Sequence, residues 1–177
     1  MQRQTIAGAL GGFVAALVMI GLMFLGRFTL GTPLIPELMA ERLFALIPME
    51  LFSLGIRLFG AKAKYLAFWG MVGLFLLIGA TLGAVFTWLP LSRQFHAAWR
   101  GVWVYVTALW LLFGLLGSPL LGGGLFGTDL QGGLLLASAP LLPVYWIYGL
   151  VMALVSSRLL RRLTDPLKSP TSNPARI

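Results

Sequence analysis

Four long apolar runs, separated by short charged or turn-forming segments, dominate the pattern of hydrophobic and polar positions along the chain. None of the runs alternates strictly between apolar and polar residues, as a half-buried β-strand would. Each is long enough for a helix of about 20 residues, which is the length that crosses the hydrocarbon core of a bilayer. The pattern therefore predicts an all-α integral membrane protein, a four-transmembrane-helix bundle. We expect crossings at about residues 5–30, 65–89, 97–116 and 134–160.

The start of the fourth crossing leaves two alternatives open, because Pro140 and Pro143 interrupt its first part. Proline lacks a backbone N–H and kinks or ends a helix. The helix either begins at Leu134 and is kinked, or it begins near Pro140. The glycine-rich stretch 117–133 that precedes it is expected to form a loop, which can dip back toward the bundle.

Residues 31–64 have a different character from the four runs, since charged and apolar positions are mixed and prolines are frequent. The pattern predicts two short helices at about residues 36–47 and 49–59, too short to span a bilayer. We expect them to be interfacial, or re-entrant and packed on the bundle. Their apolar side chains need to be covered by lipid, bundle or partner, so Phe44 and Phe52 are candidates for contact with a partner protein.

Composition supports a membrane protein, because 59% of the residues are hydrophobic and only 10% are charged. A soluble domain needs more charge than this. We expect residues 1–163 to form a single membrane domain. Residues 164–177 are rich in proline and serine, which predicts a disordered tail.

The net charge of +8 indicates orientation in a membrane rather than binding to nucleic acid. With four crossings, eight basic residues fall on the side of the termini and five on the other side, together with four of the five acidic residues. Lys and Arg are more frequent in cytoplasmic loops. We therefore expect a multi-pass protein of the inner (plasma) membrane with both termini in the cytoplasm.

The chemistry available to the chain is narrow. There is no cysteine, which excludes disulfides, thiolate metal ligands and thiol catalysis. His96 is the only histidine, so one copy of the chain cannot supply two histidine ligands to a haem, although His96 could pair with a ligand from another subunit. Glu37 and Glu41 share a helix face but have no histidine partner, and a solvated helix side is their simpler interpretation. We expect no catalytic residue, no metal site and no cofactor from this chain alone.

Two further sets of residues are candidates for binding. Tyr145, Trp146 and Tyr148 follow the two prolines of the fourth run and could line a pocket for a quinone or another flat ligand, although aromatic side chains at the membrane interface are the default interpretation. Gly79 and Gly83 form a small-xxx-small pair that lets a neighbouring helix approach closely, which makes them candidates for contact with a partner.

Three segments together resemble the N-terminal membrane region of certain bacterial molybdopterin-dependent oxidoreductases of the sulfite-oxidase type. They are Gly31-Thr-Pro-Leu-Ile-Pro-Glu-Leu38, Leu51-Phe-Ser53 with Lys62-Ala-Lys64, and Leu121-Gly-Gly-Gly-Leu-Phe-Gly127. In that family a soluble molybdenum-binding domain follows the membrane region, and residues 163–177 are not expected to form one. The resemblance therefore implies a membrane module without catalysis of its own.

The function that these observations favour is a non-catalytic membrane subunit or anchor of a larger membrane complex, such as an electron-transfer complex. The partners would be the lipid bilayer and other membrane or peripheral subunits. Two alternatives stay open: a small-solute transport or substrate-binding component with a pocket beside the fourth helix, and a quinone-associated subunit.

Overall fold

The structure is a computed structural model in which the chain is helical almost throughout, with no β-strand among the residues described. It describes residues 2–32, 34–88, 99–130, 133 and 137–164. Four helical stretches in this part are long and apolar enough to cross a membrane. They are α1 (Gln2–Leu30), α4 (Ala63–Trp88), the stretch Arg100–Leu120, and α8 (Leu141–Thr164). The predicted all-helical class and the four helices of membrane-spanning length are confirmed.

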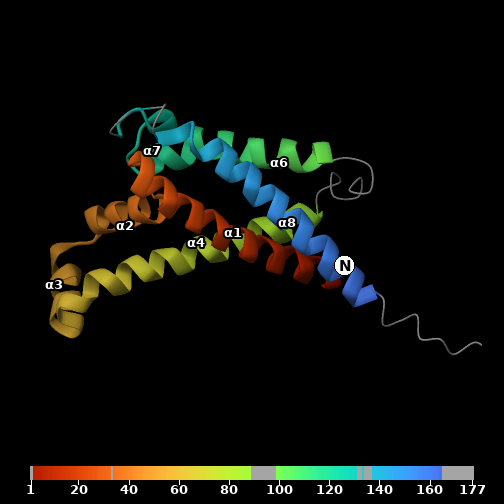
Figure 1. Ribbon diagram of the computed structural model, residues 1–177. Coiled ribbons are helices and arrows are strands. Elements are labelled where there is room, and N and C mark those ends of the chain that lie inside the picture. The colour runs from red at the N-terminus through yellow and green to blue at the C-terminus, as the bar shows by residue number, and fades with distance from the viewer. Residues whose placement is uncertain (1, 33, 89–98, 131–132, 134–136, 165–177) are drawn as a thin grey trace, which may run out of the picture.

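The central helix of the bundle is α1, which packs against α4 on one side and α8 on the other, while α6 (Trp99–Leu112) packs against α8 (Figure 1). Small residues on α1 allow both contacts. Gly8 and Gly12 lie against α4, and Gly11 lies against Ser156 of α8. Without side chains at these positions, backbones approach closely and van der Waals contact holds the helices together. The start of α1 and the end of α8 lie at the same end of the molecule (Figure 1).

The third long helix changes its hydrogen-bonding pattern along its length. After α6 come a π-helical turn, η2 (Phe113–Gly117), and a short α7 (Ser118–Leu120). The glycine-rich stretch was expected to form a loop from residue 117, but the helical path continues through Gly117 and Pro119. Pro119 has no backbone N–H to donate within this path, and it follows directly after the π turn, in which the Ser118 amide donates to the Phe113 carbonyl. The chain then leaves the helix after Leu121, through turns and the 3-10 helix η3 (Leu125–Gly127).

The segment between the first two long helices forms two helices that differ in packing. α2 (Ile35–Leu46) packs along α4, and Leu34, Ile35 and Leu38 are buried there. α3 (Met49–Phe59) begins after Pro48 and lies across the end of the bundle, beside the start of α4 (Figure 1). A 3-10 turn, η1 (Gly60–Lys62), joins α3 to α4. The segment therefore contributes one helix to the bundle and one to its end.

The fourth long helix begins at Leu141, which is the later of the two starts considered from the sequence. The amide of Leu142 donates to the Ala139 carbonyl in the turn before it. Pro143 then falls in the first turn of α8, where proline is tolerated. Residues 134–136, where the earlier start lies, and the expected tail beyond Thr164 are outside the described residues.

Candidate functional site

An apolar cavity of about 450 Å³ lies between α4 and α6 and is the candidate site. Its size falls within the range of about 300–1,000 Å³ that small-molecule sites in proteins occupy. Every long helix contributes to its wall, and α2 closes part of it. The described lining residues are Ala16, Met19, Ile35, Met39, Phe75, Ile78, Gly79, Leu82, Leu109, Leu112, Phe113, Leu116, Gly117, Leu120, Leu121, Tyr145 and Tyr148.

The cavity lies beside a contact between α6 and the last third of α4. There, Tyr105 of α6 donates a hydrogen bond of 2.8 Å to the Leu82 carbonyl of α4, and its ring lies 4.8 Å from the Phe86 ring. Away from this contact, side chains of α1 and α8 form the buried floor between α4 and α6, including Ala16 and Met19. The result is a pocket along the bundle, next to the contact of Tyr105 with Leu82 and Phe86.

The mouth of the cavity faces outward, along the surface that a bilayer would surround. Ile78 of α4 and Leu112, Leu116 and Leu120 of the third helix line the cavity and are also exposed. A molecule dissolved in the hydrocarbon of a membrane would therefore reach the cavity sideways, between two helices, without crossing water.

Two tyrosines of α8 border the cavity and differ in their hydrogen bonding. The Tyr148 hydroxyl donates to the Gly79 carbonyl on α4 at 2.8 Å, and only 3% of this residue is exposed. Tyr145 is also buried, with 8% exposed, and its ring lies 6.3 Å from that of Phe113. No hydrogen bond joins the Tyr145 hydroxyl to another residue within the part of the chain that the structure describes. Tyr148 therefore ties helices together, while Tyr145 keeps its hydroxyl available.

Trp146 lies away from the two tyrosines, although the sequence grouped the three together. Its side chain is 42% exposed, its indole N–H donates to the Thr107 hydroxyl at 3.2 Å, and its ring lies 5.5 Å from the Trp103 ring. Consecutive positions on a helix point in different directions, about 100° apart. Trp146 thus joins α8 to α6 on the outer side and does not line the cavity.

The π-helical turn η2 shapes one wall of the cavity, and sequence reasoning missed it. Phe113, Leu116 and Gly117 all come from this turn and all line the cavity. The Phe113 ring lies over Gly117, where an added Cβ would approach it to 2.6 Å. π turns inside helices are frequent at functional sites. The Gly at position 117 was the available signal, because a helix-interior glycine often marks a close approach.

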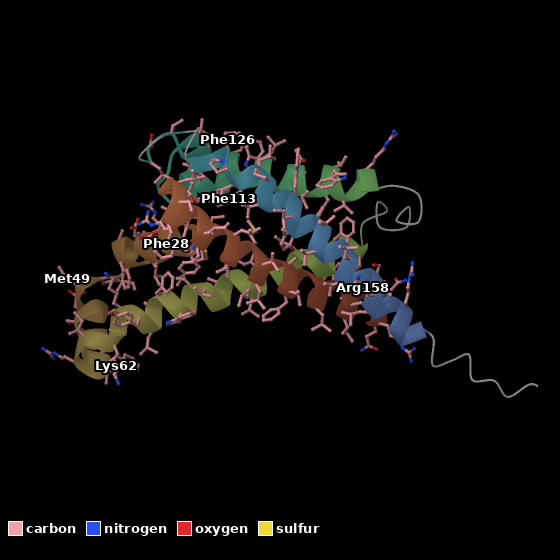
Figure 2. The ribbon with its side chains drawn as sticks, viewed as in Figure 1. Phe28, Met49, Lys62, Phe113, Phe126 and Arg158 are labelled. Carbon is pink, nitrogen blue, oxygen red and sulfur yellow. The ribbon has the colours of Figure 1, made fainter. Side chains whose placement is uncertain are left out.

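The loop after α7 folds back onto the outer side of the same helix. The Phe126 ring lies 5.2 Å from Trp110 and occupies the space above Gly114 (Figure 2). The Ser138 hydroxyl donates to the Phe126 carbonyl, and the Trp110 indole donates to the Ser138 carbonyl at 3.1 Å. Phe126 has a positive φ of 52°, a backbone conformation that residues other than glycine rarely adopt. The loop of residues 121–130 therefore covers η2.

Gly79 and Gly83 contact a helix of the same chain. An added Cβ at Gly83 would lie 2.8 Å from the Gly12 Cα, and one at Gly79 would collide with the Ala16 side chain. Both glycines are buried in the α1–α4 interface. A partner helix has no access to them there, so the small-xxx-small pair serves the internal packing of the bundle.

The remaining candidates lie apart from the cavity or outside the described residues. Phe44 is half-buried on α2. His96 and the side chain of Phe52 are outside the described part of the chain. Glu37 forms an ion pair with Arg27 at the end of α1, with 3.1 Å between the guanidinium nitrogen and the carboxylate oxygen. Glu41 is exposed. No group of three or more potential metal ligands occurs among the described residues.

Comparison with known proteins gives no match, whether with family models, curated proteins or solved structures. The resemblance to the membrane region of molybdopterin-dependent oxidoreductases therefore stays a prediction. What the chain does has to be argued from its own residues.

Proposed function

We propose that this chain is the non-catalytic membrane subunit, or anchor, of a larger complex in the bacterial inner membrane. Support for insertion comes from the outer surface of the bundle, where large apolar side chains stay exposed on every long helix. A soluble monomer rarely exposes contiguous apolar patches of more than a few hundred Å². Exposed examples are Leu10, Leu17, Leu77, Val104, Leu111 and Leu154.

The orientation in this proposal places both termini in the cytoplasm. The start of α1 and the end of α8 share one end of the molecule, near Arg158, while Met49 and Lys62 lie at the other end (Figure 2). The described residues at the end where α1 starts and α8 ends include the basic Arg3, Arg100 and Arg161. No acidic residue is found among the described residues at that end. The opposite end mixes both signs of charge, including the Arg27–Glu37 ion pair. This asymmetry follows the excess of Lys and Arg in cytoplasmic segments.

The observation that carries the anchoring role is α3, which exposes apolar side chains that the bundle leaves uncovered. Leu58 is 68% exposed and Phe59 55%. Leu51, Leu54 and Ile56 are exposed as well. Burying each such side chain contributes roughly 1.5–3 kcal/mol, so covering the apolar side chains of α3 with lipid or protein is strongly favourable.

The shape of the apolar surface on α3 favours a protein partner in addition to lipid. At about 100° per residue, Glu50, Ser53 and Arg57 fall on one narrow stripe of the helix, and apolar residues occupy more than half of the circumference. A helix lying at the bilayer surface dips only one side into the acyl chains. The rest of the apolar arc then needs cover from above the membrane, which an apolar surface of a partner subunit supplies.

Paired substitution on α3 tests the anchoring role. Leu54→Ser with Leu58→Ser is expected to lower recovery of the partner by tenfold or more from native membranes in mild detergent, because two buried leucines are lost from the contact. Leu54 and Leu58 are both exposed, whereas the contact candidate Phe44 is half-buried. Recovery is measured by quantitative mass spectrometry of proteins that co-purify with a C-terminally tagged chain.

The matched control is Leu10→Ser with Leu17→Ser, which removes two exposed leucines from α1, away from the α3 end. We expect the control to insert and to keep its partner. Full recovery of every partner by the α3 variant would mean that α3 contacts only lipid, and the anchoring role would be lost.

A further inference from the structure

The cavity between α4 and α6 has one free polar group in an otherwise apolar wall. Among its described lining residues, only Tyr145 and Tyr148 have polar side-chain atoms. The Tyr148 hydroxyl already donates to the Gly79 carbonyl. The Tyr145 hydroxyl has no such acceptor in the described part of the chain, although the residue is more than nine-tenths buried. No buried side-chain nitrogen or oxygen atom lacks a hydrogen-bond partner among the described residues, so the Tyr145 hydroxyl is accessible from the cavity, where the oxygen of a ligand can accept its hydrogen bond.

We propose that this cavity binds one lipid-soluble molecule whose carbonyl oxygen accepts a hydrogen bond from Tyr145 and whose apolar chain leaves between α4 and α6. The inference rests on the proposed membrane insertion, because the ligand arrives from the bilayer. It is independent of the partner contact at α3.

The chemistry of the wall decides the ligand class. No charged side chain occurs among the described lining residues, so a charged headgroup would be desolvated without compensation. Phe75, Phe113 and the Tyr145 ring offer flat apolar surfaces. Two membrane components combine a carbonyl with a long apolar chain, namely isoprenoid quinones and the fatty-acyl esters of glycerolipids.

The position of Tyr145 fixes how the ligand lies. Tyr145 is on the second turn of α8, one turn before Tyr148, and Phe113 of η2 is beside it. The exposed leucines at 112, 116 and 120 line the mouth on the third helix. The carbonyl group therefore lies deep, between η2 and α8, and the chain passes these leucines into the bilayer.

Native mass spectrometry of the detergent-purified full chain tests the site with two uncharged probes, decylubiquinone and a short-chain diacylglycerol. We expect one saturable adduct per chain. Tyr145→Phe removes only the hydroxyl and is expected to weaken that adduct about 3- to 10-fold, the worth of one hydrogen bond. Tyr65→Phe, at an exposed position at the start of α4, is the matched control and is expected to bind as the unmodified chain does.

A second variant, Leu116→Trp, fills the mouth of the cavity from an exposed position, so the bundle itself keeps its packing. We expect it to abolish the adduct while far-UV circular dichroism stays unchanged. Displacement of one probe by the other then distinguishes a quinone from a glycerolipid as the preferred ligand.

The proposal is overturned if neither probe forms a saturable adduct, if adducts survive Leu116→Trp, or if Tyr145→Phe binds as tightly as Tyr65→Phe. The outcome is separable from the anchoring role, because Tyr145→Phe leaves the α3 surface unchanged and should co-purify with any partner as before.

Discussion

At the scale of single residues, some glycines of this protein serve helix packing and others do not. Gly8, Gly12, Gly79 and Gly83 let two helix backbones touch, since a methyl group at any of them would collide with the opposite helix. Gly70 and Gly73, on the same α4, face open space. The sequence alone marks the pairs spaced by four, but it cannot say whether the opposite helix belongs to the same chain.

Gly83→Ala tests the internal role of these glycines. The added methyl would lie 2.8 Å from the Gly12 Cα. The atoms that it meets, at Gly8 and Gly12, belong to the backbone of α1, so α1 and α4 must move apart. We expect a destabilisation of roughly 1–3 kcal/mol, as for other overpacked contacts, measured as a lower midpoint of thermal unfolding in detergent. Gly70→Ala is the control on the same helix and should leave the midpoint unchanged. An unchanged midpoint for Gly83→Ala would show that the helices separate without cost.

The three tyrosines of the interior show how position decides the role of one residue type. Tyr105 and Tyr148 donate to the carbonyls of Leu82 and Gly79, which are neighbours one turn apart on α4. Tyr145 has the same chemistry but lines the cavity without an acceptor among the described residues. The sequence predicted a pocket near Tyr145 and Tyr148, but nothing in it separates the tyrosine that ties helices together from the one that is free.

At the scale of elements, the third helix and its loop form one unit. The π turn η2 leaves Gly114 uncovered, and the Phe126 ring fills that space while Ser138 holds the Phe126 carbonyl. Phe126 keeps its positive φ because these contacts hold it. Loop 121–130 and η2 therefore stabilise each other, and the cavity wall depends on both.

Gly114→Ala is expected to release this loop, because an added methyl would occupy the place of the Phe126 ring. Backbone amides in residues 121–130 should then exchange hydrogen at least tenfold faster, as local opening becomes easier. Hydrogen–deuterium exchange with mass spectrometry measures the change. Leu115→Ala, at the exposed neighbouring position, is the control. Equal exchange in the two variants would mean that the loop holds its place without the ring.

At the scale of the whole molecule, the start of α1 and the end of α8 lie at the same end, and the proposed four crossings make a topology that is directly testable. Reporter fusions after residue 177 and within the loop near Lys62 are expected to report opposite sides of the membrane, with the C-terminal fusion in the cytoplasm. The reason is the even number of proposed crossings and the excess of basic residues in the segments expected on the side of the termini. Reports from the same side would contradict the four-crossing topology.

The pattern of residues along the chain was sufficient to predict the all-helical class of the protein and most of its helix lengths. Long uncharged runs leave the backbone no better way to satisfy its hydrogen bonds in lipid than a helix. Pro48 divides α2 from α3 because proline acts within one turn of its own position. These effects are local, or depend only on how many apolar residues follow one another, so they can be read along the chain.

Which helix surfaces face one another could not be predicted from that pattern and became apparent from the packed bundle. Residues far apart in sequence meet in the contact between α1 and α4 and in the contact between the rings of Tyr145 and Phe113. Apolar side chains that face lipid and those that face another helix are chemically alike, so the hydrophobic pattern does not distinguish them. The cavity is the space left where four helices fail to close, and that space is set by packing geometry rather than by any residue pattern along the chain.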